Sequence, residues 1–497
     1  MIENLLSALL VFMDFRVILA LFLGAIIGTF FSAVPGLTGT LALALLLPFT
    51  YGLAPETAFV FIIGMLGGTV YGGSLTAIAI NVPGSPGSIC TSFDGYPLFK
   101  EGKGGQAIGL ATMSSVVGGV FSAIMLIVLG PQLGKVALSF GSPEYFSLAL
   151  FGLVAVITLG DDKLKSIITT MIGLLLGAVG VDLFSTFRYN FGMDILSVGV
   201  PLIPTVVGLF AISQIIGHIN DPQVDPPRNK SEKIKVVLPG WRKVKQLWKS
   251  WIRGSFVGSF IGFLPGAGGS IAAFVGYNME KKVSKTPEKF GKGSEEGIAV
   301  SESANNATVG GTLIPTITLG IPGDQFTAIM LSAFLIHGLP VGPLLFRDNQ
   351  ELINVIFLST FLTNFAFLIV GLFGAKYLIR LALVRKSLLL PAIGIIALAG
   401  SFAAGSSTVF IAFGIFFGVM GFLFKTYNFD IAPLILGLIL SGIIESAYVQ
   451  SMMISNGSFS IFFTRPFSVL FIVLAILFIL STIFDFKKIF MKSEVNA

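Results

Sequence analysis

Four short stretches rich in glycine and proline interrupt apolar runs of this 497-residue chain, at 35–39, 83–87, 265–269 and 322–324. Proline lacks a backbone donor and glycine adopts conformations that other residues avoid, so each stretch should break a helix. Inside a membrane, the freed N–H and C=O groups must be satisfied by protein, water or a ligand. The N-terminus of a half-helix suits a carboxylate without a buried lysine or arginine, and loosened carbonyls suit Na⁺.

The residues at and beside these breaks form the predicted substrate and ion site. For any single serine or threonine, tight helix packing in lipid is the competing interpretation, whereas the set of breaks taken together favours function. The candidates are Pro35, Gly36, Thr38, Gly39, Thr40, Asn81, Pro83, Gly84, Ser85, Pro265, Gly266, Gly268, Gly269, Ser270, Thr318, Pro322, Gly323 and Asp324.

A second group of candidates comes from the stretch EEGIAVSESANNATVGG, residues 295–311. On a helix, Glu302, Asn305 and Asn306 fall on one broad face, and a carboxylate within a membrane is a functional candidate by default. Glu302 either binds a coupling cation, carries a proton or caps a neighbouring helix. Asp94, in the stretch DGYP, is expected to be a turn residue at the water boundary.

The elements that position these residues are expected to be membrane helices. The chain is 54% hydrophobic and 11% charged, whereas about a quarter of the residues of a soluble protein are charged. The stretches 17–55, 57–93, 352–375 and 387–424 contain no acidic or basic side chain, and one membrane helix needs about 20 apolar residues. We predict an all-α polytopic integral membrane protein with about 11–12 membrane segments plus broken or re-entrant helices.

Charge and cysteine content exclude several other classes of function. Lys and Arg (31) outnumber Asp and Glu (25), but they cluster in short loops between apolar runs, which is typical of cytoplasmic loops and not of nucleic-acid binding. The single cysteine, Cys90, excludes an internal disulfide, and two distant histidines argue against a metal centre. We therefore predict no enzyme activity, no cofactor and no metal site.

A polar, basic stretch at 219–251 is the clearest boundary in the chain. It divides the sequence into an N-terminal transmembrane repeat (1–218), a basic cytoplasmic linker (219–251), a C-terminal transmembrane repeat with extra spans (252–484) and a cytoplasmic tail (485–497). Four spans are expected after the basic loop at 376–386, which leaves the C-terminus in the cytoplasm. Acidic residues near the N-terminus favour an outside N-terminus.

The two halves share three motifs in the same order. GTFFSAVPGLTGT (28–40) matches GSFIGFLPGAGGS (258–270), YGGSLTAIAINVPG (71–84) matches GGTLIPTITLGIPG (310–323), and DGYP (94–97) matches HGLP (337–340). Conserved order and near-constant spacing indicate an internal duplication. An odd number of membrane crossings between the copies would make it an inverted repeat, as in many secondary transporters.

These motifs resemble the TctA family, the large membrane subunit of tripartite tricarboxylate transporters. The resemblance covers residues 15–480, and the segments that carry it are PGLTGTLALALLLPFTYGL (35–53), YGGSLTAIAINVPGSPGSICTSFDGYPL (71–98), RGSFVGSFIGFLPGAGGSIAAFVGY (253–277), FGKGSEEGIAVSESANNATVGGTLIPTITLGIPGD (290–324) and IHGLPVGPLLF (336–346). Asp324 departs from the family pattern, which has mostly small residues there, so it either holds a cation or points away from an anionic substrate.

The resemblance implies a permease of the bacterial inner membrane with two partners. One is a small membrane subunit, TctB-like, and the other is a periplasmic solute-binding protein, TctC-like, that hands over a carboxylate. Uptake would be driven by an Na⁺ or H⁺ gradient, and the chain has no G-x-x-x-x-G-K-[ST] phosphate loop for ATP.

The resulting hypothesis is import of a small dicarboxylate or tricarboxylate, such as citrate, by alternating access. A passive carboxylate channel and an exporter without a binding protein are the alternatives. An elevator-like motion of the broken helices and a rocking motion of the two halves are both compatible with the sequence.

Overall fold

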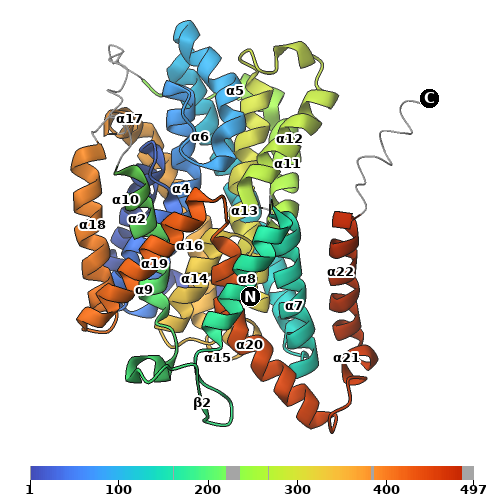
Figure 1. The fold of residues 1–497 in the computed structure, drawn as a ribbon. Helices are drawn as coiled ribbons and strands as arrows, with labels where there is room; N and C mark the ends of the chain where they lie inside the picture. The colour runs from blue at the N-terminus through green and yellow to red at the C-terminus, as the bar shows by residue number, and fades with distance from the viewer. Residues whose placement is uncertain (1, 161, 220–234, 267, 382–385, 484–497) are drawn as a thin grey trace. The chain divides into compact units, whose positions relative to one another are not determined.

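The chain folds into two compact units, each built from two separate stretches of sequence. The computed structural model describes residues 2–160, 162–219, 235–266, 268–381 and 386–483. The first unit comprises Met1–Lys135 and Leu202–Leu423, and the second comprises Val136–Pro201 and Phe424–Ala497. In their described residues both are helical (Figure 1), apart from one antiparallel hairpin formed by β1 (Gly180–Val181) and β2 (Phe187–Arg188).

Six helical segments of the described chain are long and apolar enough to cross a membrane. This agrees with the predicted all-α polytopic class, because a span needs about 20 apolar residues. They are Phe15–Ala33, Pro55–Ile80, Pro86–Ala137, Gln350–Arg380, Thr408–Thr426 and Ala432–Ile454.

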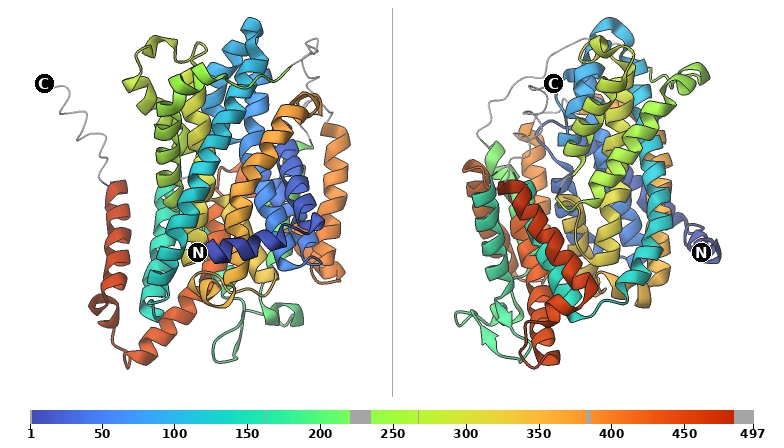
Figure 2. Two further views of the ribbon diagram at one scale, coloured as in Figure 1. Left: turned by 180° about the vertical axis from the view of Figure 1, so that it is seen from behind. Right: turned by 90° about the vertical axis from the view of Figure 1, so that its right-hand side faces the viewer.

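The first unit contains most of the helices. Its first stretch carries α1 (Ile2–Val11), α2 (Phe15–Ala33), α3 (Gly39–Leu46), α4 (Pro55–Ile80), α5 (Ile89–Leu98) and most of α6 (Gly104–Ala137). Its second stretch carries α9 (Leu202–Val206), α10 (Ser213–His218), α11 (Trp241–Phe263), α12 (Gly268–Val283), α13 (Glu295–Leu319), α14 (Gln325–Ile336), α15 (Pro343–Asp348), α16 (Gln350–Ile369), α17 (Ala375–Leu381), α18 (Lys386–Ala403) and most of α19 (Thr408–Thr426). Figure 2 shows α1 lying crosswise to the long helices of this unit.

The second unit is a smaller helical group that contains α7 (Ser142–Leu159), α8 (Lys163–Gly177), α20 (Ala432–Ile454), α21 (Ile461–Thr464) and α22 (Pro466–Ile483). The α20 helix packs against both α7 and α8. Two ion pairs tie the sequence-distant parts together, Arg188 to Glu445 at 2.8 Å and Arg465 to Glu144 at 2.5 Å.

The four predicted helix breaks are confirmed. The α2 helix ends at Ala33 and α4 ends at Ile80, while α11 ends at Phe263 and α13 ends at Leu319. In each case a new helix or a 3₁₀ turn begins within a few residues, as expected where proline cannot continue a helix and glycine reverses the chain.

Glycines allow two helix pairs of the first unit to pack with their backbones in close contact. A Cβ added to Gly28 of α2 would overlap the carbonyl oxygen of Met65 in α4, and one added to Gly258 of α11 would overlap that of Ala304 in α13. Close approach through small residues is how membrane helices associate without a hydrophobic driving force.

We expect Gly28→Ile to destabilise the first unit, because the added side chain must push α2 away from α4. Overpacking of this kind costs about 1–3 kcal/mol. Size-exclusion profile and thermal unfolding of the purified protein measure the effect. Gly442→Ile is the matched control, since Gly442 also lies in a helix but has nothing within 4 Å of a built Cβ; equal stability of the two variants would contradict the packing argument.

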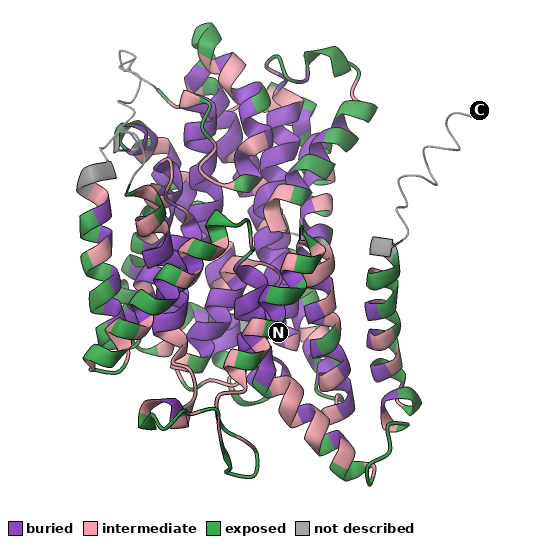
Figure 3. Ribbon diagram, viewed as in Figure 1, coloured by how far each residue is buried: buried purple, intermediate pink, exposed green. Residues whose placement is uncertain are grey.

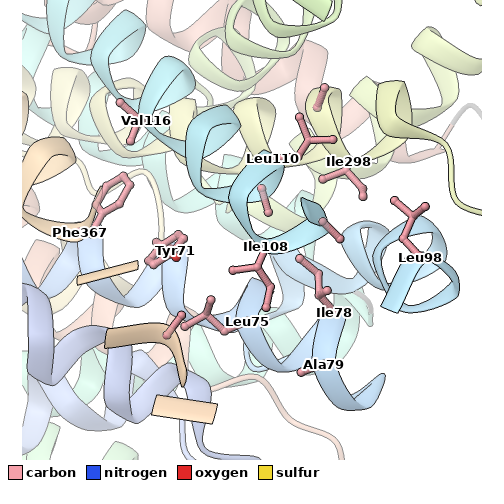
Figure 4. Close-up of a cluster of buried hydrophobic side chains, with 14 of the residues drawn as sticks. Tyr71, Leu75, Ile78, Ala79, Leu98, Ile108, Leu110, Val116, Ile298 and Phe367 are labelled. Atoms are coloured by element: carbon pink, nitrogen blue, oxygen red, sulfur yellow. The ribbon is translucent and has the colours of Figure 1, made fainter. Parts of the chain in front are cut away.

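The central helices α4 and α13 are buried along most of their length (Figure 3). A cluster of buried apolar side chains surrounds them, and Figure 4 shows Tyr71, Leu75 and Ile78 of α4 within it, together with Ile298 and Phe367. Tyr71 stacks on Phe367 at a centroid distance of 5.0 Å, and its hydroxyl lies 2.8 Å from Thr112 Oγ1. The predicted candidate residues on α13 therefore lie in the interior of the unit.

The basic residues from Trp241 onward belong to the same helix as the apolar segment after residue 252, α11 (Trp241–Phe263). Residues 220–234 of the predicted linker lie outside the described residues. The hairpin of β1 and β2 follows α8, which ends at Gly177. The four helices expected after residue 386 are present as α18, α19, α20 and α22.

Candidate substrate and ion site

The break after α4 folds the chain back onto its own helix. Asn81 ends α4 in the left-handed conformation, with φ of 58°, and Gly84 N–H donates to Gly73 O at 3.3 Å. A Cβ at Gly84 would overlap Ser32 O near the end of α2, so glycine is required at this position. A 3₁₀ turn, Pro86–Ser88, then leads into α5, with Ser88 Oγ donating to Ser85 O at 2.8 Å.

The break after α13 has a similar course. Gly320 ends the helix with φ of 73°, and Gly323 packs against Thr312 of the same helix. Asp324 is the N-cap of α14, where its Oδ1 accepts from Thr327 N–H at 2.9 Å and from Thr327 Oγ1 at 2.7 Å. A carboxylate at a helix N-terminus is stabilised by the free N–H groups and the helix dipole. This capping role accounts for the acidic residue that stood out in the sequence.

The two remaining breaks are helical hairpin turns. Gly36 and Gly266 both have positive φ, 86° and 82°. Gly266 N–H donates to Gly323 O at 2.8 Å, which joins the two breaks of the second half. In the first half, Thr38 caps α3 by accepting from Leu41 N–H, and Thr40 Oγ1 lies 2.9 Å from Thr38 Oγ1.

Gln214 of α10 is a partner of the first hairpin turn that the sequence did not indicate. Its amide nitrogen donates to Gly36 O at 2.7 Å, and its amide oxygen accepts from Thr38 Oγ1 at 3.2 Å. These contacts join residues more than 170 positions apart. The signal in the sequence is a glutamine in the largely apolar run AISQIIG.

Asn305 lies where a break of the first half meets one of the second half. Its Nδ2 donates to Val70 O at 3.3 Å, and a Cβ built on either Gly87 or Gly269 would come into close contact with its Oδ1. The 3₁₀ turn at Pro86–Ser88 also packs against α12, whose first turn contains Gly269 and Ser270. The structure thus brings together the predicted stretches 81–88 and 268–270 around the Asn305 amide.

Glu302, one helical turn before Asn306, is fully buried and bonded to neutral donors. Its carboxylate accepts from Thr91 Oγ1 of α5 and, at 2.7 Å, from Ser115 Oγ of α6, and Asn306 Nδ2 lies 3.5 Å away. Within the described residues, no lysine, arginine or histidine forms an ion pair with it. A buried ionised carboxylate without a cationic partner is costly, so this group needs a proton or a cation. It does not cap a helix, which removes one of the three roles considered for it.

Other predicted residues lie apart from this meeting point or are already satisfied. Thr318 donates its hydroxyl to Ile314 O at 2.7 Å in its own helix. Asn81 is exposed, whereas Pro265 and Pro322 are buried. The remaining break residues, Pro35, Gly39, Pro83 and Gly268, shape the turns and carry no side-chain polar group.

The expectation that Asp94 is a turn residue at the water boundary is wrong. Asp94 lies inside α5 with a buried side chain. Its Oδ2 accepts from Tyr277 hydroxyl at 2.8 Å, and its Oδ1 accepts from the backbone N–H groups of Gly291, Gly293 and Ser294 at 2.8–3.0 Å. Asp94 therefore fixes the loop that precedes α13, and with it the start of the helix that carries Glu302 and Asn305.

Comparison with known proteins places this chain in a family. No solved structure matches the chain. An uncharacterized 52.8 kDa protein of Agrobacterium vitis, from the TAR-I ttuC' 3' region, is 34% identical over 450 residues, which are 90% of this chain and 89% of that protein. A second uncharacterized protein of the same organism, from the TAR-II ttuC' 3' region, is 34% identical over 209 residues, 42% of this chain and 86% of that protein. Residues 18–436 match the family described as "Tripartite tricarboxylate transporter TctA family", and the chain, a multi-pass membrane protein, belongs to that family.

Proposed function

We propose that this chain is the large permease subunit through which a small carboxylate, a dicarboxylate or a tricarboxylate such as citrate, enters the cell against its gradient. The energy comes from an Na⁺ or H⁺ gradient. Because TctA proteins are membrane components of tripartite transporters, the chain is not an enzyme. The observation that carries the substrate class is the meeting of two helix starts, those of the turn before α5 and of α12, at the Asn305 amide.

The chemistry of that meeting point suits an anion. The first turn of a helix has free N–H groups and partial positive charge, so it binds a carboxylate without a buried basic side chain. Ser85 and Ser270 add hydroxyl donors beside the two helix starts, and Ser85 is partly exposed. Broken helices whose ends face substrate and ion are a recurrent design in secondary transporters.

The residues assigned to substrate and ion are those of the four breaks together with Glu302, Asn305 and Asn306. The stretches 81–88 and 265–270 are assigned to the carboxylate, and Asn305, whose Oδ1 faces Gly87 and Gly269, is assigned to positioning these two helix starts. The stretches 35–40 and 318–324 are the repeat-related counterparts of 265–270 and 81–88. The helices that follow them, α3 and α14, pack against each other. Thr318 and Asp324 act there through the backbone they support, since their side chains bond within their own segments.

An inverted repeat accounts for the paired breaks. Gly258 follows Gly28 by 230 residues, and Gly311 follows Gly72 by 239 residues. The contacts between the helices obey the same offsets. Gly28 contacts Met65, and their counterparts Gly258 and Ala304 contact each other. Gly72 contacts Thr29, and their counterparts Gly311 and Ser259 also contact each other. The contacts of α5 support opposite directions of α4 and α13, the equivalent helices of the two repeats. Gly73 and Ile78 of α4 lie beside Ser88 and Gly95, so α5 runs parallel to α4. Gly87, Thr91 and Asp94 lie beside Asn305, Glu302 and Gly297, so α5 runs antiparallel to α13.

The remaining assignments concern organisation and partners. The halves 1–218 and 252–484 carry the two repeats, joined by the linker at 219–251, and the linker and the tail at 485–497 face the cytoplasm of a bacterial inner membrane. A small TctB-like membrane subunit and a periplasmic TctC-like binding protein complete the transporter, the latter delivering the carboxylate.

Reconstitution in proteoliposomes tests this function. The chain, its small membrane subunit and its binding protein are assayed with radiolabelled citrate, succinate and malate under an imposed Na⁺ or proton gradient. We expect at least one carboxylate to accumulate above its external concentration only when a gradient is present and the binding protein is added. Uptake that only equilibrates and ignores the gradient would support a passive channel instead, and gradient-driven transport without the binding protein would support the exporter alternative.

A further inference from the structure

A small cavity in the first unit lies apart from the Asn305 meeting point. It opens between α4, α6, α13 and α16, and has room for about one water molecule. Its polar lining consists of amide and hydroxyl side chains, and its apolar lining includes Phe367. The lining residues used below are Gly67, Gly119, Asn306, Thr360, Thr363 and Asn364.

Two buried oxygens in this lining have no hydrogen-bond partner within the described residues, Asn306 Oδ1 and Thr363 Oγ1. Both side chains are 99% buried, with exposed fractions of 1%. Leaving a polar atom unpaired in a dry interior costs free energy, so such atoms mark a ligand or a functional requirement.

The orientation of the two asparagine amides is set by their helices. Asn306 Nδ2 donates to Glu302 O at 3.1 Å, and Asn364 Nδ2 donates to Thr360 O at 2.7 Å. A backbone carbonyl can only accept, so the nitrogen of each amide must face it and the oxygen is left for another partner. Thr360 likewise uses its hydroxyl proton on Ile356 O. The cavity therefore presents acceptor oxygens, as a cation site does.

A charged group that contacts the lining residue Asn306 has the sign that a cation requires. Glu302 lies one turn before Asn306 on α13, and its Oε2 is 3.5 Å from Asn306 Nδ2. Its other partners, Thr91 and Ser115, are neutral hydroxyls. One carboxylate with several neutral oxygens balances a single positive charge, which favours a monovalent ion over a divalent one.

We propose that this cavity binds one Na⁺ ion, held by the side-chain oxygens of Asn306, Thr360, Thr363 and Asn364 and balanced by the Glu302 carboxylate. The role of this Na⁺ ion in driving uptake rests on the proposed function, whereas the binding of Na⁺ to the cavity does not. The ion would join α13 and α16, so its occupancy would affect the same helix that holds Asn305.

Equilibrium binding of ²²Na⁺ to the purified full-length chain in nanodiscs tests the site, with choline and K⁺ as reference cations. We expect saturable Na⁺ binding by the wild type, and at least about tenfold weaker binding by Thr363→Val, which keeps the shape but removes one ligand oxygen. Thr363→Ser should retain binding. Ser359→Ala is the matched control, since this hydroxyl lies one turn earlier on α16 and donates to Val355 O; its affinity for Na⁺ should be unchanged.

Glu302→Gln provides a second test if Thr363→Val does not yield folded protein, and it should also weaken Na⁺ binding at least about tenfold. No saturable Na⁺ binding by the wild type would overturn the proposal. Equal affinities of the wild type, Thr363→Val and Glu302→Gln would overturn it too, because they would mean that the cavity holds water and no ion. Either result could occur while carboxylate uptake proceeds on a proton gradient, so failure of the Na⁺ site and failure of the proposed function are distinguishable.

Discussion

Gly87→Ala is expected to reduce carboxylate uptake about a hundredfold or more while the protein still inserts and folds. A Cβ at this position would overlap Asn305 Oδ1, so the amide must move away from the turn before α5. Displacement of a binding group by about 1 Å is enough for a hundredfold loss of function. The backbone of Gly87 is not in the left-handed region, so alanine adds a steric effect without conformational strain. Uptake by the reconstituted three-component system measures it.

Gly52→Ala is the matched control for this variant. Gly52 also lies outside the regular helices, and nothing is within 4 Å of its built Cβ. Uptake by Gly52→Ala should equal that of the wild type. If Gly87→Ala, recovered as a monodisperse protein, also transports at the wild-type rate, the contact between Gly87 and Asn305 does not position the substrate site.

Asp94→Ala is expected to cause the largest loss of stability among single substitutions away from the helix breaks. Four donors converge on this carboxylate, the Tyr277 hydroxyl and three backbone N–H groups of 291–294. The substitution removes the acceptor of all four hydrogen bonds. Each buried donor left unsatisfied costs about 1–3 kcal/mol, so the total loss should be about 3 kcal/mol or more. Thermal unfolding of the purified protein should shift to a clearly lower temperature.

Asp348→Ala serves as the control for Asp94→Ala. Asp348 pairs with the adjacent Arg347 on the surface, and exposed pairs contribute about 1 kcal/mol or less. Asp94→Asn should fall between the two, because an amide keeps one acceptor oxygen. A thermal midpoint for Asp94→Ala within the range of Asp348→Ala would mean that the loop before α13 is held by other contacts.

The positions of the helix breaks could be predicted from the sequence because their causes are local. Clusters of proline and glycine lie within a few residues of the points where α2, α4, α11 and α13 end. The polar face of α13 was also predictable, since Glu302, Asn305 and Asn306 stand out in a helix that is buried along most of its length. These signals need no knowledge of the partner helices.

The partners of those residues could not be predicted, because they depend on tertiary contacts. Thr91 and Ser115 reach Glu302 from positions 211 and 187 residues away, and each alone resembles an ordinary small residue of a membrane helix. Asp94 was placed wrongly for the same reason. The stretch DGYP consists of residues common in turns, but the Asp94 carboxylate is buried because it accepts from donors about 200 positions later in the chain. Local propensity is a weak guide where burial decides.

The placement of Asp324 shows how one contact changes an interpretation. From the sequence, an acid beside an anion site was a difficulty, and a cation ligand was one explanation. Its bonds to Thr327 instead give it the role of a helix cap, which an acidic residue fills well. The acid therefore has a structural role that is independent of the carboxylate proposed to bind near Asn305.

Substrate protection of a cysteine at the helix break tests the central proposal most directly. The single native cysteine, Cys90, is buried and can be replaced by alanine, after which Ser85→Cys and, separately, the exposed Ser458→Cys each provide one site for a water-soluble maleimide. In the assembled transporter with carboxylate-loaded binding protein, we predict that the carboxylate slows labelling of Ser85→Cys and leaves Ser458→Cys unchanged. If labelling of Ser85→Cys is equally fast with and without the carboxylate, in protein that transports it, the substrate does not bind at these breaks.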